Sequence, residues 1–469
     1  MNERTLQKSV AFIDSWLEFR YGRLEIPGFV VAIAHKGNIV FKNAYGFANL
    51  EKQEKLTTDH IFRIASHSKT FTATAIMQLQ EKGKLRVDDY TVKYAPWLKQ
   101  HKDKRWQKVT IRQLLSHSAG VIRDGVDADY WQLDTPFPNA QELKKAILES
   151  DLVLGTNIQM KYSNFGYSLL GMVIEATSGQ PYNKYVSENI VKLLKLNNTG
   201  PELESKIVNK IATAYTRRDV NKTRRPIANV DTKSMSSATG FYSTVEDLCK
   251  YFTAHMVGSK KLLDDESKKE MQRLQWQVKN SKERHEYGFG LEIEYVDERR
   301  LIGHGGGFPG HITKSMFDPK DELVVTVLTN CIDGGASEIA KGVISVINYF
   351  QNNSATRKLK HDLSKFEGRF MSLWSMVNVV SVGSKIVAVY PDTWQPFIEL
   401  EELERVDDKT LKVTKTNSFY SEGELVRFTF GAQGEVRSVN YSGGTMLPEQ
   451  DWIARQSLQK RIGNESGKK

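Results

Sequence analysis

The spacing of apolar residues along the chain changes several times, and each change predicts a new element. In residues 1–20 apolar side chains recur three or four positions apart, which predicts an amphipathic helix. Two strand-like apolar runs follow, at residues 29–35 and 39–46, and a short Lys-Gly-Asn turn joins them. Two such runs on either side of a short polar turn predict a hairpin.

From Phe62 to about residue 255 helical spacing dominates, with polar loops between the apolar runs. Strand-like patterns then return, and a helix is predicted over 336–350. The later strands are expected at residues 287–296, 299–306, 312–318 and 322–330. Together with the hairpin they can form one antiparallel sheet. The predicted fold class is therefore α+β, an α/β sandwich in which terminal helices flank an antiparallel sheet and a helical domain is inserted over about residues 62–286.

The pattern changes again after residue 350, where we place the end of the first domain, residues 1–350. Residues 351–365 are polar and predict a linker. Short strand-like runs separated by Gly, Asp and Asn turns then fill residues 366–460, which predicts an all-β, barrel-like domain. Residues 461–469 are predicted to be a disordered tail.

The composition is that of a globular protein. Of the 469 residues 40% are hydrophobic and 26% charged, which excludes a disordered chain or a coiled-coil fibre. The longest run without a charge, residues 370–384, is too short for a membrane helix, and the charged N-terminal residues do not form a secretory leader. We therefore expect a cytoplasmic protein with no membrane partner. Two cysteines, Cys249 and Cys331, provide neither a disulfide framework nor a metal site, and no cofactor is expected.

The net charge is +10, and one segment carries a dense share of it. Residues 216–226 hold five Arg or Lys and one Asp. A solvated loop is one interpretation, and a basic rim that attracts acidic substrates is another. No nucleic-acid-binding signature accompanies this segment, so we expect no nucleic-acid partner.

A serine and a lysine three positions apart are the first candidate for chemistry. Ser66 and Lys69 form an S-x-x-K motif between a strand-like run and an apolar helical run. The spacing predicts that both lie on one face at the start of a helix. A lysine in a partly desolvated cleft can take the proton of a serine, which is otherwise a poor nucleophile. The motif alone is weak, because Ser457 and Lys460 repeat it near the C-terminus.

Two further motifs follow in chain order. Tyr162 and Asn164 form a Y-x-N at the start of another helical run, where a phenol can relay protons and an amide can bind a carbonyl group. His304 precedes a run of glycines at the end of a predicted strand, where a ligand can approach the backbone closely. These glycines also match G-x-G-x-x-G, but the strand that follows excludes a dinucleotide-binding turn.

The three motifs in this order resemble those of the serine β-lactamase and penicillin-binding-protein superfamily. The chain is most similar to class C β-lactamases, D-aminopeptidases and β-lactamase-like esterases, the group that includes S12-type serine peptidases. Segments 109–121, 236–252 and 287–293 also match segments of that family, and the resemblance covers residues 5–350. The β domain resembles the lipocalin-like domain of some of these peptidases.

The resemblance implies a role for each residue of the three motifs. Ser66 is expected to be the acylated nucleophile, Lys69 its general base and Tyr162 the proton relay. Substrate would be bound by Asn164 and by the third-motif residues, and the backbone N–H groups of Ser66 and Gly307 would form an oxyanion hole. The third-motif residues are His304, Gly305, Gly306 and Gly307. His117 is expected to be structural.

The third motif differs from that of β-lactamases and DD-peptidases, which usually have Lys-Thr-Gly or Lys-Ser-Gly at this position. A histidine is mostly neutral at pH 7, and Gly305 has no hydroxyl group, so a substrate carboxylate would be held less firmly. We therefore expect a serine hydrolase that acts on small esters, amides or peptides with a D-residue. A β-lactamase or DD-carboxypeptidase with penicillin-binding ability is one alternative, and an inactive binding protein on the same fold is another. The oligomeric state stays open.

Overall fold

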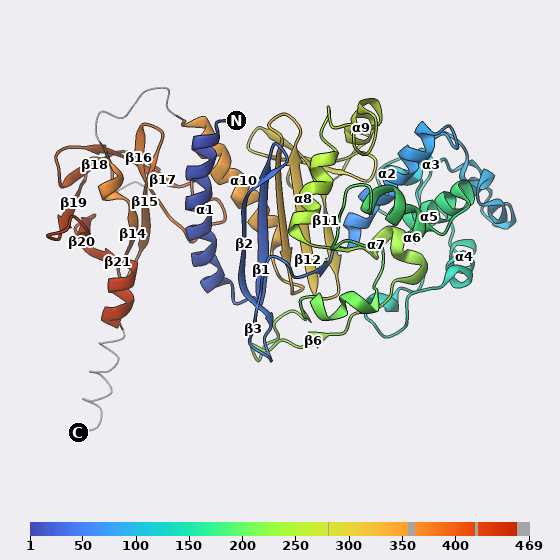
Figure 1. Ribbon diagram of the computed structural model, residues 1–469, viewed down its shortest axis with the longest axis horizontal. Coiled ribbons are helices and arrows are strands. Elements are labelled where there is room, and N and C mark those ends of the chain that lie inside the picture. Colours follow the sequence, from blue (N-terminus) through green and yellow to red (C-terminus); the bar gives the residue numbers. More distant parts are fainter. Residues whose placement is uncertain (280, 355–361, 418–420, 457–469) are drawn as a thin grey trace, which may run out of the picture. The chain divides into compact units, whose positions relative to one another are not determined.

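The computed structural model describes residues 1–279, 281–354, 362–417 and 421–456 (Figure 1). The chain divides into two compact units. One comprises residues 24–340, and the other comprises residues 1–23 together with the residues after 340. The predicted tail, the second S-x-x-K motif and residues 355–361 of the predicted linker lie outside the described residues. The predicted domain boundaries therefore stay predictions.

The larger unit is built on one nine-stranded antiparallel sheet of order β3-β2-β1-β13-β12-β11-β10-β9-β8. The predicted hairpin and the four predicted later strands all belong to it. Its strands are β1 (Gly28–His35), β2 (Asn38–Asn49), β3 (Glu54–Lys55), β8 (Trp276–Gln277), β9 (His285–Tyr287), β10 (Glu292–Val296), β11 (Arg299–Phe308), β12 (His311–Asp318) and β13 (Leu323–Thr329). β1 and β13 are buried along their whole length, which explains their continuous apolar sequence.

Short paired strands and helices fill the segment between the two halves of the sheet. The two short pairs are β4 (Phe62–Arg63) with β7 (Tyr242–Ser243) and β5 (Ala214–Tyr215) with β6 (Pro226–Ile227). The helices of this segment are α2 (Ser68–Glu81), α3 (Ile111–Leu115), α4 (Ala140–Leu148), α5 (Asn164–Ser178), α6 (Tyr182–Val186), α7 (Ser236–Thr239), α8 (Val245–Ala254) and α9 (Asp265–Gln272). Residues 116–139 contain only one short 3-10 turn, so the predicted helical block includes long loops.

α2 is the central helix of this segment. Every residue from Ser68 to Leu79 is buried, so the helix has no solvent-facing side there. Its threonines are satisfied by other elements: Thr72 bonds to Tyr182 on α6, and Thr74 to Tyr251 on α8. These bonds tie the helix to α6 and α8, which gives a rigid base to the residues at its first turn.

The smaller unit contains α1 (Glu3–Leu24), most of α10 (Ala336–Asn352) and a closed barrel. The barrel confirms the predicted all-β region. Its strands follow one another around the barrel as β14 (Gly368–Met371), β15 (Met376–Val382), β16 (Lys385–Val389), β17 (Leu400–Arg405), β18 (Thr410–Thr416), β19 (Leu425–Phe430), β20 (Val436–Tyr441) and β21 (Gly444–Pro448). Apolar side chains pack in its interior, among them Phe366, Phe370, Val413 and Phe428.

α1 packs against the barrel through one buried face. The Trp16 indole donates to the carbonyl of Pro391, and its ring meets that of Trp394 edge to face. The Phe12 ring lies 6.0 Å from that of Phe350 on α10 and 5.1 Å from that of Phe397. The amphipathic pattern of the first 20 residues therefore serves contacts with segments near the other end of the chain. Among the described residues, no helix is long and apolar enough to cross a membrane.

Candidate active site

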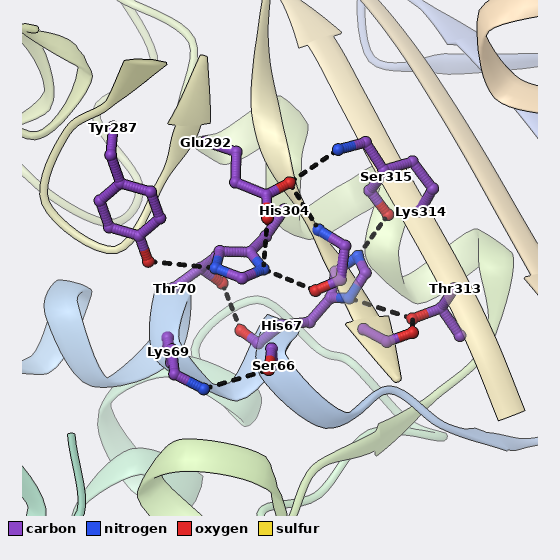
Figure 2. Close-up of polar contacts among 12 residues, drawn as sticks. Ser66, His67, Lys69, Thr70, Tyr287, Glu292, His304, Thr313, Lys314 and Ser315 are labelled. Carbon is purple, nitrogen blue, oxygen red and sulfur yellow. Dashed lines mark hydrogen bonds and ion pairs between the residues drawn. The ribbon is translucent and has the colours of Figure 1, made fainter. Parts of the chain in front are cut away.

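Ser66 lies in a 3-10 turn, η1 (Ala65–His67), that leads directly into α2. Ala65 has a φ of 46°, in the left-handed region that residues other than glycine rarely adopt. The side chain of His67 ties this turn to β12, with Nε2 3.0 Å from the Ser315 hydroxyl and Nδ1 3.2 Å from the Thr313 hydroxyl (Figure 2). The turn is therefore held at fixed distance from the sheet, while Ser66 itself remains partly exposed.

Lys69 is buried one turn further along, and its ammonium group points back to the serine (Figure 2). Its Nζ donates to the Ser66 hydroxyl over 3.1 Å, to Asn164 Oδ1 over 2.7 Å and to the Ala238 carbonyl over 2.8 Å. Burial disfavours the charged form and lowers the pKa of Lys69 to about 7. A lysine with this pKa is partly neutral near pH 7, so it can accept a proton from its neighbour.

Tyr162 packs beside Lys69, whose Nζ lies 4.8 Å from the centre of the Tyr162 ring. Burial raises the pKa of Tyr162, and a hydrogen bond with Ser66 partly opposes the rise. The His117 ring lies 4.3 Å from the Tyr162 ring, and its Nδ1 accepts the Ser163 N–H over 3.2 Å. His117 therefore supports the segment that carries the Y-x-N motif.

Asn164 begins α5, and the Ser163 side chain caps that helix. The Asn164 amide connects two charged groups. Its oxygen accepts from Lys69, and its Nδ2 donates to Asp124 Oδ1 over 2.7 Å. One amide hydrogen is therefore committed to Asp124. Asp124 could not be recognised from the sequence, because it stands in a loop with no periodic pattern.

The glycines of β11 lie on an edge of the sheet that opens beside Ser66. β10 pairs with β11 only as far as Gly303, so the strand has a free edge beyond that point. The Gly305 N–H faces this edge, and backbone groups two residues apart face the same side, so the Gly307 N–H faces it too. A Cβ at Gly306 would lie 2.2 Å from the Ile64 carbonyl oxygen, so only glycine allows β11 to approach the nucleophile turn this closely.

His304 is less accessible than the sequence indicated. Only 1% of it is exposed, and the hydroxyl of Tyr287 lies 3.1 Å from its Nε2 (Figure 2). Its Nδ1 bonds to the Gly305 carbonyl, so this nitrogen carries the proton and Nε2 accepts from the tyrosine. Burial lowers the pKa of His304 to about 4. The imidazole is therefore neutral over the physiological range and faces protein groups on both nitrogens.

Glu292 is a second residue that the sequence did not single out. Its carboxylate accepts the Gly305 N–H over 3.1 Å and the Lys314 ammonium over 2.7 Å, and it lies 3.7 Å from His304 Nδ1 (Figure 2). Lys314 also pairs with Glu294. The two carboxylates raise the pKa of Lys314, and the lysine and His304 lower that of Glu292. The ion pair of Glu292 and Lys314 therefore holds the third motif in place through the Gly305 N–H.

The structure brings Ser66, Lys69 and Asn164 into direct contact, with Tyr162 against the lysine. The basic run lies in the loop between β5 and β6. Its Arg218 and Arg224 are paired with Glu25 and Asp333, while Arg217 and Arg225 are exposed. Within the described residues, no group of three or more His, Cys, Asp or Glu is arranged to hold a metal ion.

Comparison of the whole chain with known sequences gives a family match and several distant relatives. A family model described as beta-lactamase matches residues 9–342. Protein flp of Staphylococcus aureus strain COL is 28% identical over 188 residues, 40% of this chain and 37% of that protein. Beta-lactamase-like protein 2 of Dictyostelium discoideum is 28% identical over 276 residues, 56% of this chain and 48% of that protein. Each match thus spans less than half of the relative.

Two solved structures show the same fold. The octameric penicillin-binding protein homologue from Pyrococcus abyssi superposes with a TM-score of 0.64 at 22% identity, over 93% of this chain and 99% of that chain. The D-stereospecific amidohydrolase from a Streptomyces species gives a TM-score of 0.61 at 25% identity, over 72% of this chain and 97% of that chain.

Proposed function

Since the chain belongs to the beta-lactamase family, we propose that it is a serine hydrolase that forms an acyl-enzyme at Ser66. The observation that carries the proposal is the 3.1 Å contact between the Ser66 hydroxyl and Lys69, whose pKa is lowered to about 7 by burial. The nucleophile and its base are thus within hydrogen-bond reach, and a third group, Asn164, orients the base.

In the proposed acylation, neutral Lys69 takes the proton of Ser66, and Oγ attacks the substrate carbonyl. The charge on the carbonyl oxygen is stabilised by the N–H groups of Ser66 and Gly307, and the free edge of β11 supports this assignment. Tyr162 passes its proton to the leaving group as the bond breaks and receives in turn the proton that Lys69 took from Ser66, so that Lys69 is neutral again. Water then attacks the acyl ester, Lys69 and Tyr162 accept its proton, and the same proton returns to Ser66 Oγ as the acyl group leaves.

We propose small esters, or amides and peptides with a D-residue, as the substrate class. The reason is the third motif: His304 is neutral and both its nitrogens are engaged, so it offers no cation to a substrate carboxylate. A charge-assisted bond contributes about 1.5–3 kcal/mol, against roughly 1 kcal/mol for a neutral one. The similarity to a D-stereospecific amidohydrolase is in keeping with this class. Esterase or S12-type peptidase activity in the cytoplasm, without a cofactor, is part of the same proposal.

Intact-mass spectrometry after incubation with a fluorophosphonate, and separately with a labelled penicillin, tests the proposal. We expect one fluorophosphonate adduct per chain, mapped to the peptide that contains Ser66. A rapid and stable penicillin adduct on the same residue would favour the penicillin-binding alternative. If neither reagent labels Ser66, the chain is a binding protein on this fold, and the proposed hydrolase activity is wrong.

A further inference from the structure

Asp124 is a buried carboxylate that is bound by three different donors beside the candidate active site. Only 7% of the residue is exposed. Its Oδ1 accepts from Asn164 Nδ2 over 2.7 Å and from the Trp131 indole over 3.0 Å, and its Oδ2 lies 3.1 Å from Arg123 Nε. Of these contacts, the one to Asn164 leads to the catalytic group.

Through Asn164 the carboxylate determines which end of an amide faces Lys69. The amide oxygen accepts from the lysine, and the amide nitrogen donates to Asp124. If the amide were reversed, its NH₂ group would face the donors of Lys69, and its oxygen would face the carboxylate. Both contacts would then be repulsive, so the chain Lys69–Asn164–Asp124 has only one favourable direction.

We propose that Asp124 is a positioning residue of this active site, which holds the Asn164 amide with its oxygen towards Lys69 and supplies the negative charge that this amide links to that lysine. This inference rests on the proposed function, in which Lys69 acts as the base. It assigns Asp124 no contact with the substrate. Its effect is on the orientation and the proton equilibrium of the residue that removes the proton from Ser66.

The charges around Lys69 determine the direction in which Asp124 shifts the pKa of this lysine. Burial lowers the pKa of Lys69, and Asp124 is the strongest influence that raises it. Arg123, in the same loop, lowers it, and Glu292 on β10 raises it. The remaining ionisable groups that face the lysine are His117, His304 and the phenols of Tyr162 and Tyr167, all of them neutral near pH 7 because of burial. Removing the Asp124 charge is therefore expected to lower the pKa of Lys69 further.

The loop that carries Asp124 is held by backbone contacts that do not involve its carboxylate. The Tyr130 hydroxyl donates to the Asp124 carbonyl over 2.8 Å. The Arg123 carbonyl accepts the N–H groups of Asn164 and Phe165 over 2.9 and 3.1 Å. Variants of the side chain alone should therefore retain the loop, so that the two effects of Asp124 can be separated.

Two substitutions separate charge from orientation. Asp124→Asn keeps an acceptor oxygen for Asn164 Nδ2 but removes the charge. Asp124→Leu removes the negative charge and the acceptor oxygen together. Asp127→Asn is the matched control, because Asp127 is an exposed carboxylate of the same loop whose Oδ1 accepts a backbone N–H. The rate of fluorophosphonate labelling at Ser66 is measured from pH 5 to pH 9 for each variant. Melting temperature is recorded as a check on folding.

For Asp124→Asn we expect the acidic limb of the labelling profile to move to lower pH by about one unit, with a plateau close to wild type. For Asp124→Leu we expect the plateau to fall on the order of 100-fold, because the amide is free to reverse and Lys69 loses its orientation. Asp127→Asn should leave both unchanged. If Asp124 only stabilised the fold, both Asp124 variants would have a lower melting temperature, and the acidic limb of the labelling profile would not move.

An unshifted limb in Asp124→Asn, together with a wild-type plateau in Asp124→Leu, overturns the proposal. Failure of the hydrolase itself has a different result, because the wild-type protein would then not label at any pH. In that case the ¹³Cε resonance of Lys69, followed as a function of pH in wild type and in Asp124→Asn, still tests the effect of Asp124. Equal titration midpoints in the two proteins would refute it.

Discussion

The surroundings of Ser66 and the interior of the barrel both contain buried polar groups, but these groups have different partners. In the barrel, the Glu401 side chain is 2% exposed and accepts from three hydroxyl groups, those of Ser421, Thr416 and Tyr441. All three donors are neutral. Beside Ser66, by contrast, the buried charges of Lys69 and Asp124 face each other through one amide.

This difference separates groups that stabilise a fold from groups that can do chemistry. A carboxylate that is saturated by hydroxyl donors has no proton to exchange with its neighbours, so its contribution is to stability. Lys69 is held close to its point of half-protonation near pH 7 by burial and by nearby charges, which is the condition that acid–base catalysis requires. We therefore expect substitutions to affect activity in one region and stability in the other.

The largest expected effect comes from Ser66→Ala, which removes the proposed nucleophile. Hydrolysis of p-nitrophenyl acetate or butyrate should fall by at least about 1,000-fold, because no acyl-enzyme can form. Ser457→Ala, in the second copy of the motif, should leave the rate unchanged.

Lys69→Ala and Tyr162→Phe should each slow acylation, and their effects should not add, since both groups transfer the same proton. Full activity in Ser66→Ala would refute the assignment.

Deleting residues 352–469 tests whether the barrel takes any part in the chemistry. The fragment should still label at Ser66, because every group of the candidate site lies in residues 24–340. It should melt at a lower temperature, because Trp16 and Phe12 lose their partners at Pro391, Trp394 and Phe397. Exposure of each large apolar side chain costs roughly 1.5–3 kcal/mol. Calorimetry and fluorophosphonate labelling provide the two readouts, and a fragment that folds but does not label would contradict the comparison.

Acidification should also distinguish the two units. Burial lowers the pKa of five histidines in residues 24–340: His67 and His255 to about 3, His304 and His311 to about 4, and His117 well below its ordinary value. In the unfolded chain these groups titrate near 6.5, so below that pH the unfolded state binds more protons. Their contribution to stability is complete above pH 6.5 and declines as the pH falls towards 4.

The described residues of the other unit contain no histidine, so the barrel lacks this sensitivity. Hydrogen exchange followed by mass spectrometry at pH 7 and pH 5, corrected for intrinsic rates, should show protection lost in residues 24–340 and kept in β14–β21. Equal losses in both regions would count against this account of the histidines.

A smaller effect is expected inside the barrel. Glu401→Gln retains a side chain of the same size but supplies an NH₂ group where three hydroxyl donors converge. The mismatch should lower the free energy of unfolding by about 1–3 kcal/mol, as measured by urea titration. The rate of ester hydrolysis at 25 °C should equal that of wild type. A loss of activity without a loss of stability would mean that the barrel acts on the site.

The smallest expected effect belongs to the exposed arginines of the basic run. Arg217→Gln with Arg225→Gln leaves the paired Arg218 and Arg224 intact. If the loop steers anionic substrates, kcat/KM for an anionic ester should fall about threefold or less at low salt and recover as salt is added, since exposed charges are screened within about 8 Å at physiological ionic strength. A neutral ester is the control. No change for either ester would leave only the solvated-loop interpretation.

The sequence predicted those features that depend on local pattern. The strands of the main sheet have continuous or alternating apolar runs, and the S-x-x-K spacing alone places Lys69 one helical turn from Ser66. Asp124 and Glu292 could not be found in this way, because their partners come from other elements. Gly305 meets Glu292 only because β10 pairs with β11 up to Gly303. The burial of His304 was missed for the same reason, since a reference pKa describes a solvated side chain.

The local sequence pattern also could not predict where α1 packs, because an amphipathic helix presents the same apolar face to any partner. Its contact with the barrel has a consequence for the order in which the protein is made. The Trp16 indole and the Pro391 carbonyl are separated by 375 positions. During synthesis the helix leaves the ribosome long before the residues that cover it exist. The smaller unit must therefore complete its packing late, and a ribosome stalled before residue 391 holds a nascent chain in which α1 still lacks its contacts with Pro391, Trp394 and Phe397.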